Sequence, residues 1–218
     1  MGNRDRGGGA DYLARIHGTE EDRVNCPFYF KIGACRHGDK CSRNHNKPPF
    51  SQTVFIPHLY RNPLVKDLNT GARTTRGHED QPKDPEFEEF MVDLFEEVAK
   101  FGEVQDIAVC DNVCDHLLGA VYIKYYDEED ADKCLKSLTG RHYAGVEVKP
   151  EFCPVSDFSE SRCRQYDKRR CDRGGSCNFM HIKKVSRDLD RDLFYEQPYK
   201  GHRSRPKRRS RSSSSDSA

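Results

Sequence analysis

DPEFEEFMVDLFEEVAKFGEVQDIAV, residues 84–109, carries the strongest structural signal in the chain. Pro85 suits the first helical position, because its ring fixes φ near the helical value. The apolar residues that follow it at helical spacing are Phe87, Phe90, Leu94, Val98 and Phe101. This spacing predicts a helix over residues 86–100, and the apolar run from Val104 to Val109 predicts a strand directly after it.

Further secondary-structure elements are predicted on both sides of this pair. Before it, residues 52–59 (QTVFIPHL) have the composition of a strand, and residues 61–83 form a long polar connection. After it, the pattern predicts a strand over 120–125, a helix over 127–138 and a fourth strand over 146–149. The order is therefore β-α-β-β-α-β, which is the RRM arrangement and belongs to the α+β class.

Two clusters of cysteine and histidine flank this central domain. The first has the spacing C-x8-C-x5-C-x3-H and the second C-x7-C-x5-C-x3-H. The predicted metal ligands are Cys26, Cys35, Cys41 and His45 in the first cluster and Cys163, Cys171, Cys177 and His181 in the second. Three thiolates and one imidazole complete a tetrahedral Zn²⁺ site with no open position, so two structural zinc ions are expected. Two such similar spacings in one chain argue against scattered free cysteines.

The composition agrees with a small protein that needs metal sites. The chain has 218 residues, 34% of them hydrophobic, and a mean hydropathy of −0.94, so one large apolar core is not expected. No stretch approaches the roughly 18 to 20 apolar residues that span a bilayer, and no apolar signal segment opens the chain. Without a secretory signal, ten cysteines favour metal ligands and free thiols over disulfides. The cysteines expected to be thiols without a special role are Cys110, Cys114, Cys134 and Cys153.

Cationic and aromatic residues concentrate in the two finger segments, although the formal net charge of the chain is only +1. Those of the first finger are Phe28, Tyr29, Phe30, Arg36, Lys40 and Arg43, and those of the second are Arg162, Arg164, Tyr166, Lys168, Arg169, Arg170, Arg173 and Phe179. A finger of this size has too little secondary structure to enter a duplex groove. Single-stranded RNA, bound by base stacking and phosphate contacts, is its natural target. Any one of the aromatic residues could instead pack the small core of its finger.

The central domain lacks part of the usual RNA-binding surface of an RRM. Residues 118–125 (LGAVYIKY) stand where the RNP1 motif is expected but lack its opening basic residue and first aromatic, whereas Phe55 keeps a stacking position. The predicted first helix carries Glu86, Glu89, Asp93 and Glu97 near one face. Such a face suits either a cationic partner or plain solvation.

Four segments together resemble the small subunit of the U2 auxiliary factor, a family of pre-mRNA splicing factors. They are VNCPFYFKIGACRHGDKCSRNHNKP (24–48), CDNVCDHLLGAVYIKY (110–125), PVSDF (154–158) and CRQYDKRRCDRGGSCNFMH (163–181). The resemblance implies that the two fingers jointly bind the AG dinucleotide at the 3' end of an intron, in the nucleus. It also implies that the central domain is a U2AF-homology-motif domain that binds a Trp-bearing peptide of the large subunit, and that the Arg/Ser tail contacts other splicing factors.

The resemblance also assigns roles to individual residues. The RNA-facing positions are Phe28, Arg36, Ser42 and Arg43 in the first finger and Arg164, Gln165, Asn178 and Phe179 in the second. The partner-facing positions are Asp93 and Glu97 on the helix and Arg141, His142 and Tyr143 in a loop, where Arg141 pairs with an acidic group and Tyr143 covers the Trp of the partner. His142 stands where the family has a Trp, and the chain contains no Trp. The heterodimer is therefore expected to be weaker or to use another segment of the large subunit.

The expected organisation has five parts. They are a flexible Gly/Arg-rich N-terminus (1–18), a first CCCH finger (19–47), the RRM-like domain (48–153), a second CCCH finger (154–182) and a basic Arg/Ser-rich tail (183–218).

Other functions remain open at this point. The protein could be a protein-interaction adaptor whose fingers only stabilise the fold, or a diverged CCCH protein that binds RNA without AG specificity. An RNA endonuclease is the enzymatic alternative. No catalytic residues are expected, because the sequence has no open metal site, no nucleophile with an adjacent base and no phosphate-binding Gly loop.

Overall fold

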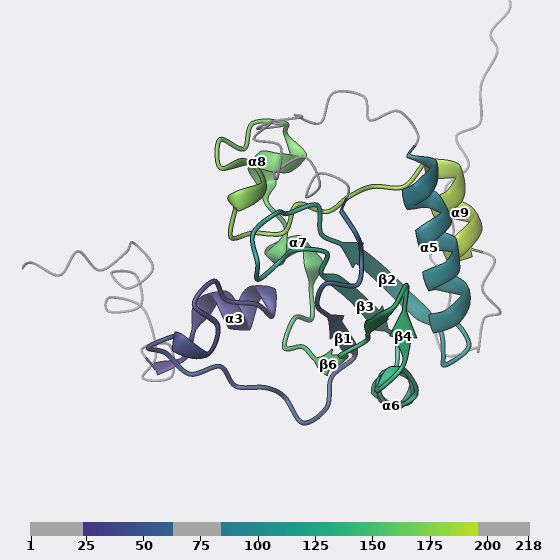
Figure 1. The fold of residues 1–218 in the computed structure, drawn as a ribbon, viewed down its shortest axis with the longest axis horizontal. Coiled ribbons are helices and arrows are strands. Elements are labelled where there is room, and N and C mark those ends of the chain that lie inside the picture. Colours follow the sequence, from purple (N-terminus) through teal and green to yellow (C-terminus); the bar gives the residue numbers. More distant parts are fainter. Residues whose placement is uncertain (1–23, 63–83, 196–218) are drawn as a thin grey trace, which may run out of the picture.

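A four-stranded antiparallel sheet forms the centre of the computed structural model, which describes residues 24–62 and 84–195 (Figure 1). The strands are β1 (Thr53–Ile56), β2 (Val104–Val109), β3 (Val121–Tyr125) and β6 (Glu151–Phe152), in the order β2-β3-β1-β6. The helices α5 (Pro85–Val98) and α6 (Glu128–Leu138) lie between the strands in the sequence, as predicted. The RRM fold that the pattern predicts is therefore confirmed.

Helix α5 begins as its sequence predicts. The Asp84 carboxylate accepts a hydrogen bond from the Phe87 amide at 3.2 Å, and Pro85 occupies the first turn. The Lys183 ammonium lies 2.6 Å from the same carboxylate. Burial alone raises the pKa of Asp84, but the hydrogen bonds from Lys183 and Phe87 bring it below its ordinary value. The start of α5 is thus tied to a residue that follows the second finger.

The two faces of the sheet bury different partners, because side chains alternate along each strand. On β1, Val54 and Ile56 pack into the core under α5 and α6, whereas Phe55 points to the opposite face. Tyr122, which pairs with Phe55 across the sheet, is 0% exposed and packs against residues of both fingers. The face with which an RRM usually contacts RNA is thus largely covered by the fingers.

The predicted fourth strand, residues 146–149, is a strand only at Val146–Glu147, and its predicted place in the main sheet is wrong. Val146–Glu147 instead forms β5, which pairs only with β4 (His142–Tyr143) in a separate hairpin. The turn between them has positive φ at Ala144 (47°) and Gly145 (81°), the geometry that joins two strands by a two-residue loop. Pro150 then lacks an amide donor, and pairing with β1 begins only at Glu151.

The chain after the second finger also differs from the prediction, which placed residues 183–195 in a tail. Helix α9 (Arg187–Tyr195) contacts α5 and β2, and Figure 1 shows α5 and α9 side by side. Phe194 lies 5.3 Å from Phe95 between ring centroids. The apolar Leu189, Leu193 and Phe194, spaced for one helical face among charged residues, were the available signal.

The fingers are built from short elements. These are α3 (Pro27–Ile32) and the 3₁₀ turn Gly38–Lys40 in the first, and α7 (Phe158–Ser161), α8 (Arg164–Asp167) and the 3₁₀ turn Gly174–Ser176 in the second. The predicted flexible N-terminus, most of the polar connection over 61–83 and the Arg/Ser sequence beyond 195 lie outside the described residues. Among the residues that the structure describes, no helix has the length and apolar character to cross a membrane.

Candidate metal centres and nucleic-acid interface

The structure brings the eight predicted metal ligands into two groups of four. In each group the ligand atoms of three cysteines and one histidine lie within 4.8 Å of one another. The sulfurs of Cys35 and Cys41 are 3.9 Å apart, and that of Cys163 is 3.7 Å from Cys171 and 3.8 Å from Cys177. A tetrahedral ion with Zn–S bonds of about 2.3 Å requires sulfurs roughly 3.8 Å apart. The spacing in both groups matches that requirement.

The histidines supply an independent test of the fit to zinc. The Nε2 atoms of His45 and His181 are buried and have no hydrogen-bond partner in the described part of the chain. Burial, assisted by the Arg173 cation, lowers the pKa of His181 to about 4, so its imidazole is neutral. A buried, neutral and unpaired ring nitrogen is what a metal ligand requires. Each finger therefore has a structural zinc site.

The two fingers repeat the same internal contacts. The Tyr29 ring stacks on His45 at 4.5 Å, and Tyr166, at the same distance in sequence from its first cysteine, stacks on His181 at 3.9 Å. An amide donates to a ligand sulfur in each, from His37 to Cys35 and from Tyr166 to Cys163. One face of each tyrosine ring is therefore taken up by a ligand histidine. For these two aromatics the structure favours core packing over RNA stacking.

Finger 1 reaches the sheet through the end of α3. Ile32 is 0% exposed and packs with Tyr122 and Val155. Gly33 follows with φ of 73°, and a Cβ at this position would lie 2.1 Å from the Cys153 sulfur. The backbone of finger 1 therefore touches the central domain at a point where only glycine fits.

Finger 2 is attached by hydrogen bonds as well as by the apolar contacts of Phe158 and Met180. The Asp111 amide donates to the His181 carbonyl at 2.7 Å, and the Tyr166 hydroxyl lies 3.1 Å from the Asp111 carboxylate. The Asn62 amide group donates to the carbonyl of the same Asp111 at 3.2 Å. The segment between β2 and β3 thus meets finger 2 on its zinc-ligand side.

A cleft of about 410 Å³ opens at the side of finger 2 that faces finger 1. Its lining residues are Lys31 of α3 together with Glu160, Arg162, Cys163, Arg164, Gln165, Arg173 and Phe179. The Phe28 ring of finger 1 lies 6.4 Å from the Phe179 ring, edge to face, so one aromatic from each finger meets beside the cleft. Helices α3 and α7 are in contact, although they are far apart in the sequence (Figure 1).

The RNA-facing residues expected from the resemblance separate into two groups. Arg164, Gln165 and Phe179 line the cleft, and Phe28 contacts Phe179. Arg36, Ser42, Arg43 and Asn178 are not among its lining residues. Arg36 and Ser42 are exposed, whereas the Arg43 guanidinium donates to the Asn25 carbonyl at 3.3 Å within finger 1. The Asn178 side-chain oxygen is buried.

The partner-facing residues expected from the resemblance meet at one edge of α5. Glu97 lies 2.6 Å from Lys100 and also forms an ion pair with Arg141. These two cations lower the pKa of the Glu97 carboxyl. Asp93 and His142 are exposed, and the Tyr143 ring is 38% exposed and lies 5.9 Å from Phe90. The rings of Phe90 and Tyr143 therefore form a pair beside the acidic side chains of α5.

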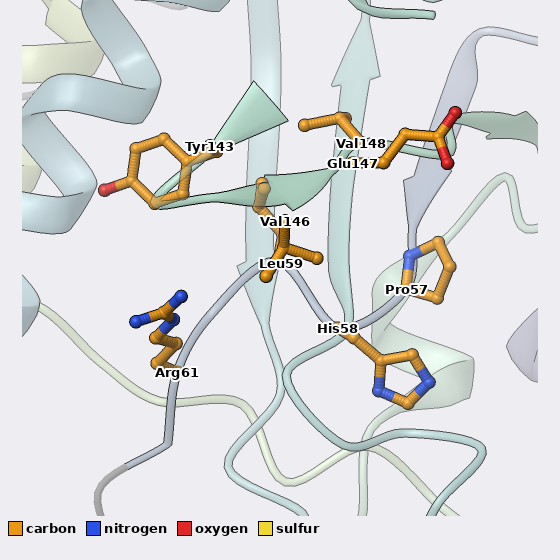
Figure 2. A pocket seen from close by; sticks show the side chains of 8 residues that line it. All are labelled: Pro57, His58, Leu59, Arg61, Tyr143, Val146, Glu147 and Val148. Carbon is orange, nitrogen blue, oxygen red and sulfur yellow. The ribbon is translucent and has the colours of Figure 1, made fainter. Parts of the chain in front are cut away.

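A crevice of about 10 Å³ lies on the other side of Tyr143, between the hairpin and the segment that follows β1 (Figure 2). Leu59 and Val146 are among its lining residues, and the Arg61 guanidinium donates to the Ala144 carbonyl. Its volume is about that of one water molecule, so it holds no larger ligand in this conformation.

Sequence reasoning missed residues that take part only because distant segments meet. Lys31 lines the cleft, and Asp111, Asn112 and Lys183 connect finger 2 to the central domain. The sequence gives no signal for Lys31 beyond its charge, since its role depends on where finger 2 lies.

Comparison with known proteins agrees with this architecture. The family model for zinc fingers of the C-x8-C-x5-C-x3-H type (and similar) matches residues 21–47, and the model for the RNA recognition motif matches residues 91–149.

Relatives extend the match to most of the chain. The splicing factor U2AF 26 kDa subunit of Bos taurus is 50% identical over 216 residues, which cover 93% of this chain and 96% of the relative. The Homo sapiens 26 kDa subunit is 50% identical over 194 residues, covering 87% and 86%, and the splicing factor U2af 38 kDa subunit of Drosophila melanogaster is 50% identical over 187 residues, covering 85% and 71%. With two CCCH zinc sites on an RRM fold and relatives of this identity and coverage, the chain belongs to the small-subunit family of the splicing factor U2AF.

Proposed function

We propose that this protein recognises the AG dinucleotide at the 3' splice site of pre-mRNA, in the nucleus, as the small subunit of a U2 auxiliary factor heterodimer. The observation that carries the proposal is the cleft beside finger 2, because it combines charge, a planar ring and an amide in one open cleft. Four of its lining residues are cations, namely Lys31, Arg162, Arg164 and Arg173.

The chemistry of the cleft suits a short stretch of single-stranded RNA. Its volume of about 410 Å³ falls in the range of ligand-binding pockets, so unstacked bases fit. Phe179 offers a ring face, and Arg164 and Gln165 carry donors that can reach base edges. The cations contribute phosphate contacts, which supply affinity without sequence preference. Base selection is therefore assigned to the aromatic and amide groups.

The central sheet is left with little part in RNA binding under this proposal. Tyr122 has no exposed surface, and Phe55 is half-buried with its ring 4.8 Å from Tyr122. A base cannot stack on a ring that already lies under the fingers. Recognition by the fingers therefore takes the place of the usual RRM mode.

The acidic edge of α5 supports a protein partner for the central domain. Tyr143 and Phe90 form an aromatic surface. Burial raises the pKa of Tyr143, and the nearby carboxylates of Asp93 and Glu89 raise it further. A basic peptide with an aromatic anchor is complementary to this surface. The large subunit is the proposed source of that peptide, and other Arg/Ser-rich splicing factors are proposed contacts of the tail.

No catalytic step forms part of the proposal. Each zinc site has four protein ligands, which leaves no coordination position for a substrate or water.

The test is binding of zinc-loaded protein, alone and with the large subunit, to short single-stranded RNAs in which a pyrimidine tract ends in AG or in CG. The expected result is tighter binding to the AG RNA, with the preference lost in Arg164→Ala and Phe179→Ala. Lys136→Ala, on an exposed face of α6, is the matched control and should change nothing. Equal affinity for both RNAs would contradict AG recognition and leave a general RNA-binding protein. Undetectable affinity with two zinc ions bound would leave an adaptor.

A further inference from the structure

The segment between β2 and β3, residues 111–117, lies against both fingers. On the finger 2 side, the Val113 amide donates to the Gly175 carbonyl at 2.9 Å, and the Cys114 sulfur lies 3.5 Å from the Cys177 carbonyl. On the finger 1 side, Leu117 is 0% exposed and belongs to the same buried apolar cluster as Ile32 and Ala34 of finger 1. One loop of the central domain is therefore in a position to set where the fingers lie.

Asn112 is the residue of this loop that enters finger 2. Its side chain is 0% exposed, and its amide nitrogen donates to the carbonyls of Cys177 at 3.0 Å and Phe179 at 3.1 Å. Its amide oxygen accepts from the His181 amide at 2.8 Å. Both donors and the acceptor of the carboxamide are thus used, on the backbone of two zinc ligands and of a residue that lines the cleft.

These contacts fix the orientation of finger 2 more tightly than apolar packing would. Hydrogen bonds in a buried site are directional, and each broken one leaves an unpaired polar group. The amide of the preceding residue, Asp111, donates to the His181 carbonyl, so the segment from Cys177 to His181 is bound along its length by two consecutive residues of the central domain. Phe179 lies in the middle of that segment.

We propose that Asn112 is a positioning residue for RNA recognition. From the central domain, it sets the backbone of residues 177–181 so that Phe179 and the cleft keep the geometry that selects AG. Asn112 itself touches no RNA in this scheme. The inference rests on the proposed function and adds that the selectivity of finger 2 depends on a residue outside the finger.

The first experiment measures zinc content and RNA affinity of Asn112→Leu in the full chain. Leucine has a similar size but makes none of the three hydrogen bonds, while all eight zinc ligands remain. The expected result is two zinc ions per chain, about tenfold weaker binding to the AG RNA and loss of the preference over the CG RNA. Asn46→Leu is the matched control, since the exposed Asn46 amide bonds only to the side chain of Asn25 among the described residues, and it should bind like the wild type.

A second experiment shifts finger 2 at the neighbouring contact of the same loop, between Val113 and Gly175, without removing a hydrogen-bonding group. A Cβ at Gly175 would lie 2.4 Å from a methyl carbon of Val113, so Gly175→Ala pushes finger 2 away from the loop. Val113→Ala removes that methyl. The expected results are loss of AG preference in Gly175→Ala, its recovery in the double variant, and near-normal binding by Val113→Ala alone. If Asn112→Leu releases zinc, the comparison of Gly175→Ala with the double variant tests whether the position of finger 2 controls AG preference.

The outcomes separate this inference from the proposed function. Wild-type protein without AG preference overturns the proposed function before any variant is tested. If the wild type prefers AG but Asn112→Leu keeps both its zinc and its preference, the positioning role is overturned. A double variant that binds no better than Gly175→Ala overturns it as well.

Discussion

Tyr29 and Tyr166 show how much of each zinc site lies outside its four ligands. Each ring stacks on the face of the histidine ligand, at 4.5 Å for Tyr29 on His45 and 3.9 Å for Tyr166 on His181, and so restricts how the imidazole can tilt. Such supporting contacts orient ligands and reduce the entropy lost on binding the ion. Because structural zinc supplies much of the folding free energy of so small a unit, each finger is expected to unfold without its ion.

The ligand assignment predicts the effect of removing one sulfur. In Cys171→Ser, finger 2 should lose its zinc and its fold, so zinc content measured by mass spectrometry or a colorimetric chelator falls from two ions to one per chain. Cys114→Ser is the matched control, because this half-buried cysteine is outside both ligand groups and should leave two ions bound. Unchanged zinc content in Cys171→Ser would refute the ligand set.

The ligands could be predicted from the sequence because their spacing is local. The residues that line the cleft could not be predicted in the same way. Arg164 and Arg43 look alike in sequence, yet one lines the cleft and the other bonds within finger 1. The difference depends on the approach of two segments separated by more than a hundred residues, and no local pattern records it.

At the scale of single elements, the start of α5 combines two roles in one carboxylate. Asp84 caps the helix and pairs with Lys183, whose side chain is only 6% exposed and which also donates to the Tyr60 hydroxyl. A buried ammonium requires a partner, because leaving a buried charge unpaired is costly. The connection between finger 2 and α9 is therefore held to the first turn of α5.

The two roles of Asp84 can be separated by substitution. Asp84→Ser keeps a capping oxygen and loses the ion pair, whereas Asp84→Ala loses both. We expect Asp84→Ala to lower the free energy of unfolding by about 2 kcal/mol, and Asp84→Ser to lower it by roughly 1 kcal/mol less, as caps contribute about that much. Denaturant unfolding of the zinc-loaded protein measures both. Equal losses would mean that the cap contributes nothing beyond the ion pair.

The exposed Tyr143 of the β4–β5 hairpin predicts how a substitution there affects binding of the large-subunit peptide. Tyr143 is 38% exposed and contacts Phe90 from one side only, so Tyr143→Ala should cost little stability. It should nevertheless weaken binding of a large-subunit peptide by at least about tenfold, as expected for an aromatic residue at the centre of an interface. Calorimetric titration with the peptide is the measurement, and Tyr126→Ala, an exposed tyrosine next to the end of β3, is the control. Unchanged affinity in Tyr143→Ala would move the peptide site elsewhere.

Long periodic elements were predictable and short ones were not. The helical spacing of apolar residues in α5 and α6 and the short apolar runs of β2 and β3 place these elements within about two residues, because burial of a whole element leaves a recognisable pattern. The two-residue strands β4, β5 and β6 are too short to show a period. Their pairing is decided by the turn at Ala144 and by Pro150, and the alternation of residues 146–149 suggested the wrong neighbour.

At the scale of the whole molecule, the fingers and the sheet form one body. Gly33 marks the closest approach of finger 1, and the β2–β3 segment holds finger 2. The Tyr122 ring at the centre of the contact lies 4.8 Å from Phe55 and 6.1 Å from Phe158, which belongs to α7. The sheet thus acts as the common support on which the cleft is assembled.

This arrangement predicts different outcomes for two glycines of finger 1. Gly33 and Gly38 both have positive φ, but a Cβ at Gly33 would collide with Cys153, whereas a Cβ at Gly38 would meet nothing within 4 Å. Both alanine substitutions introduce the same kind of backbone strain, of about 1 kcal/mol. Gly33→Ala should additionally displace finger 1 from the sheet and lower RNA affinity severalfold with zinc retained. RNA titrations that show equal affinity for the two variants would contradict docking through Gly33.

The burial of the finger-facing side of the sheet also bears on how the protein is made. The last sheet strand ends at Phe152, but Met180 and His181, which complete the cover over Tyr122 and the second zinc site, are translated later. A nascent chain therefore carries a finished sheet with part of one apolar face bare until finger 2 leaves the ribosome and captures its ion. In zinc-starved cells finger 2 cannot bind its ion, so the apolar face of the sheet stays exposed. Newly synthesised protein is then expected to accumulate on chaperones or in aggregates while older molecules remain folded.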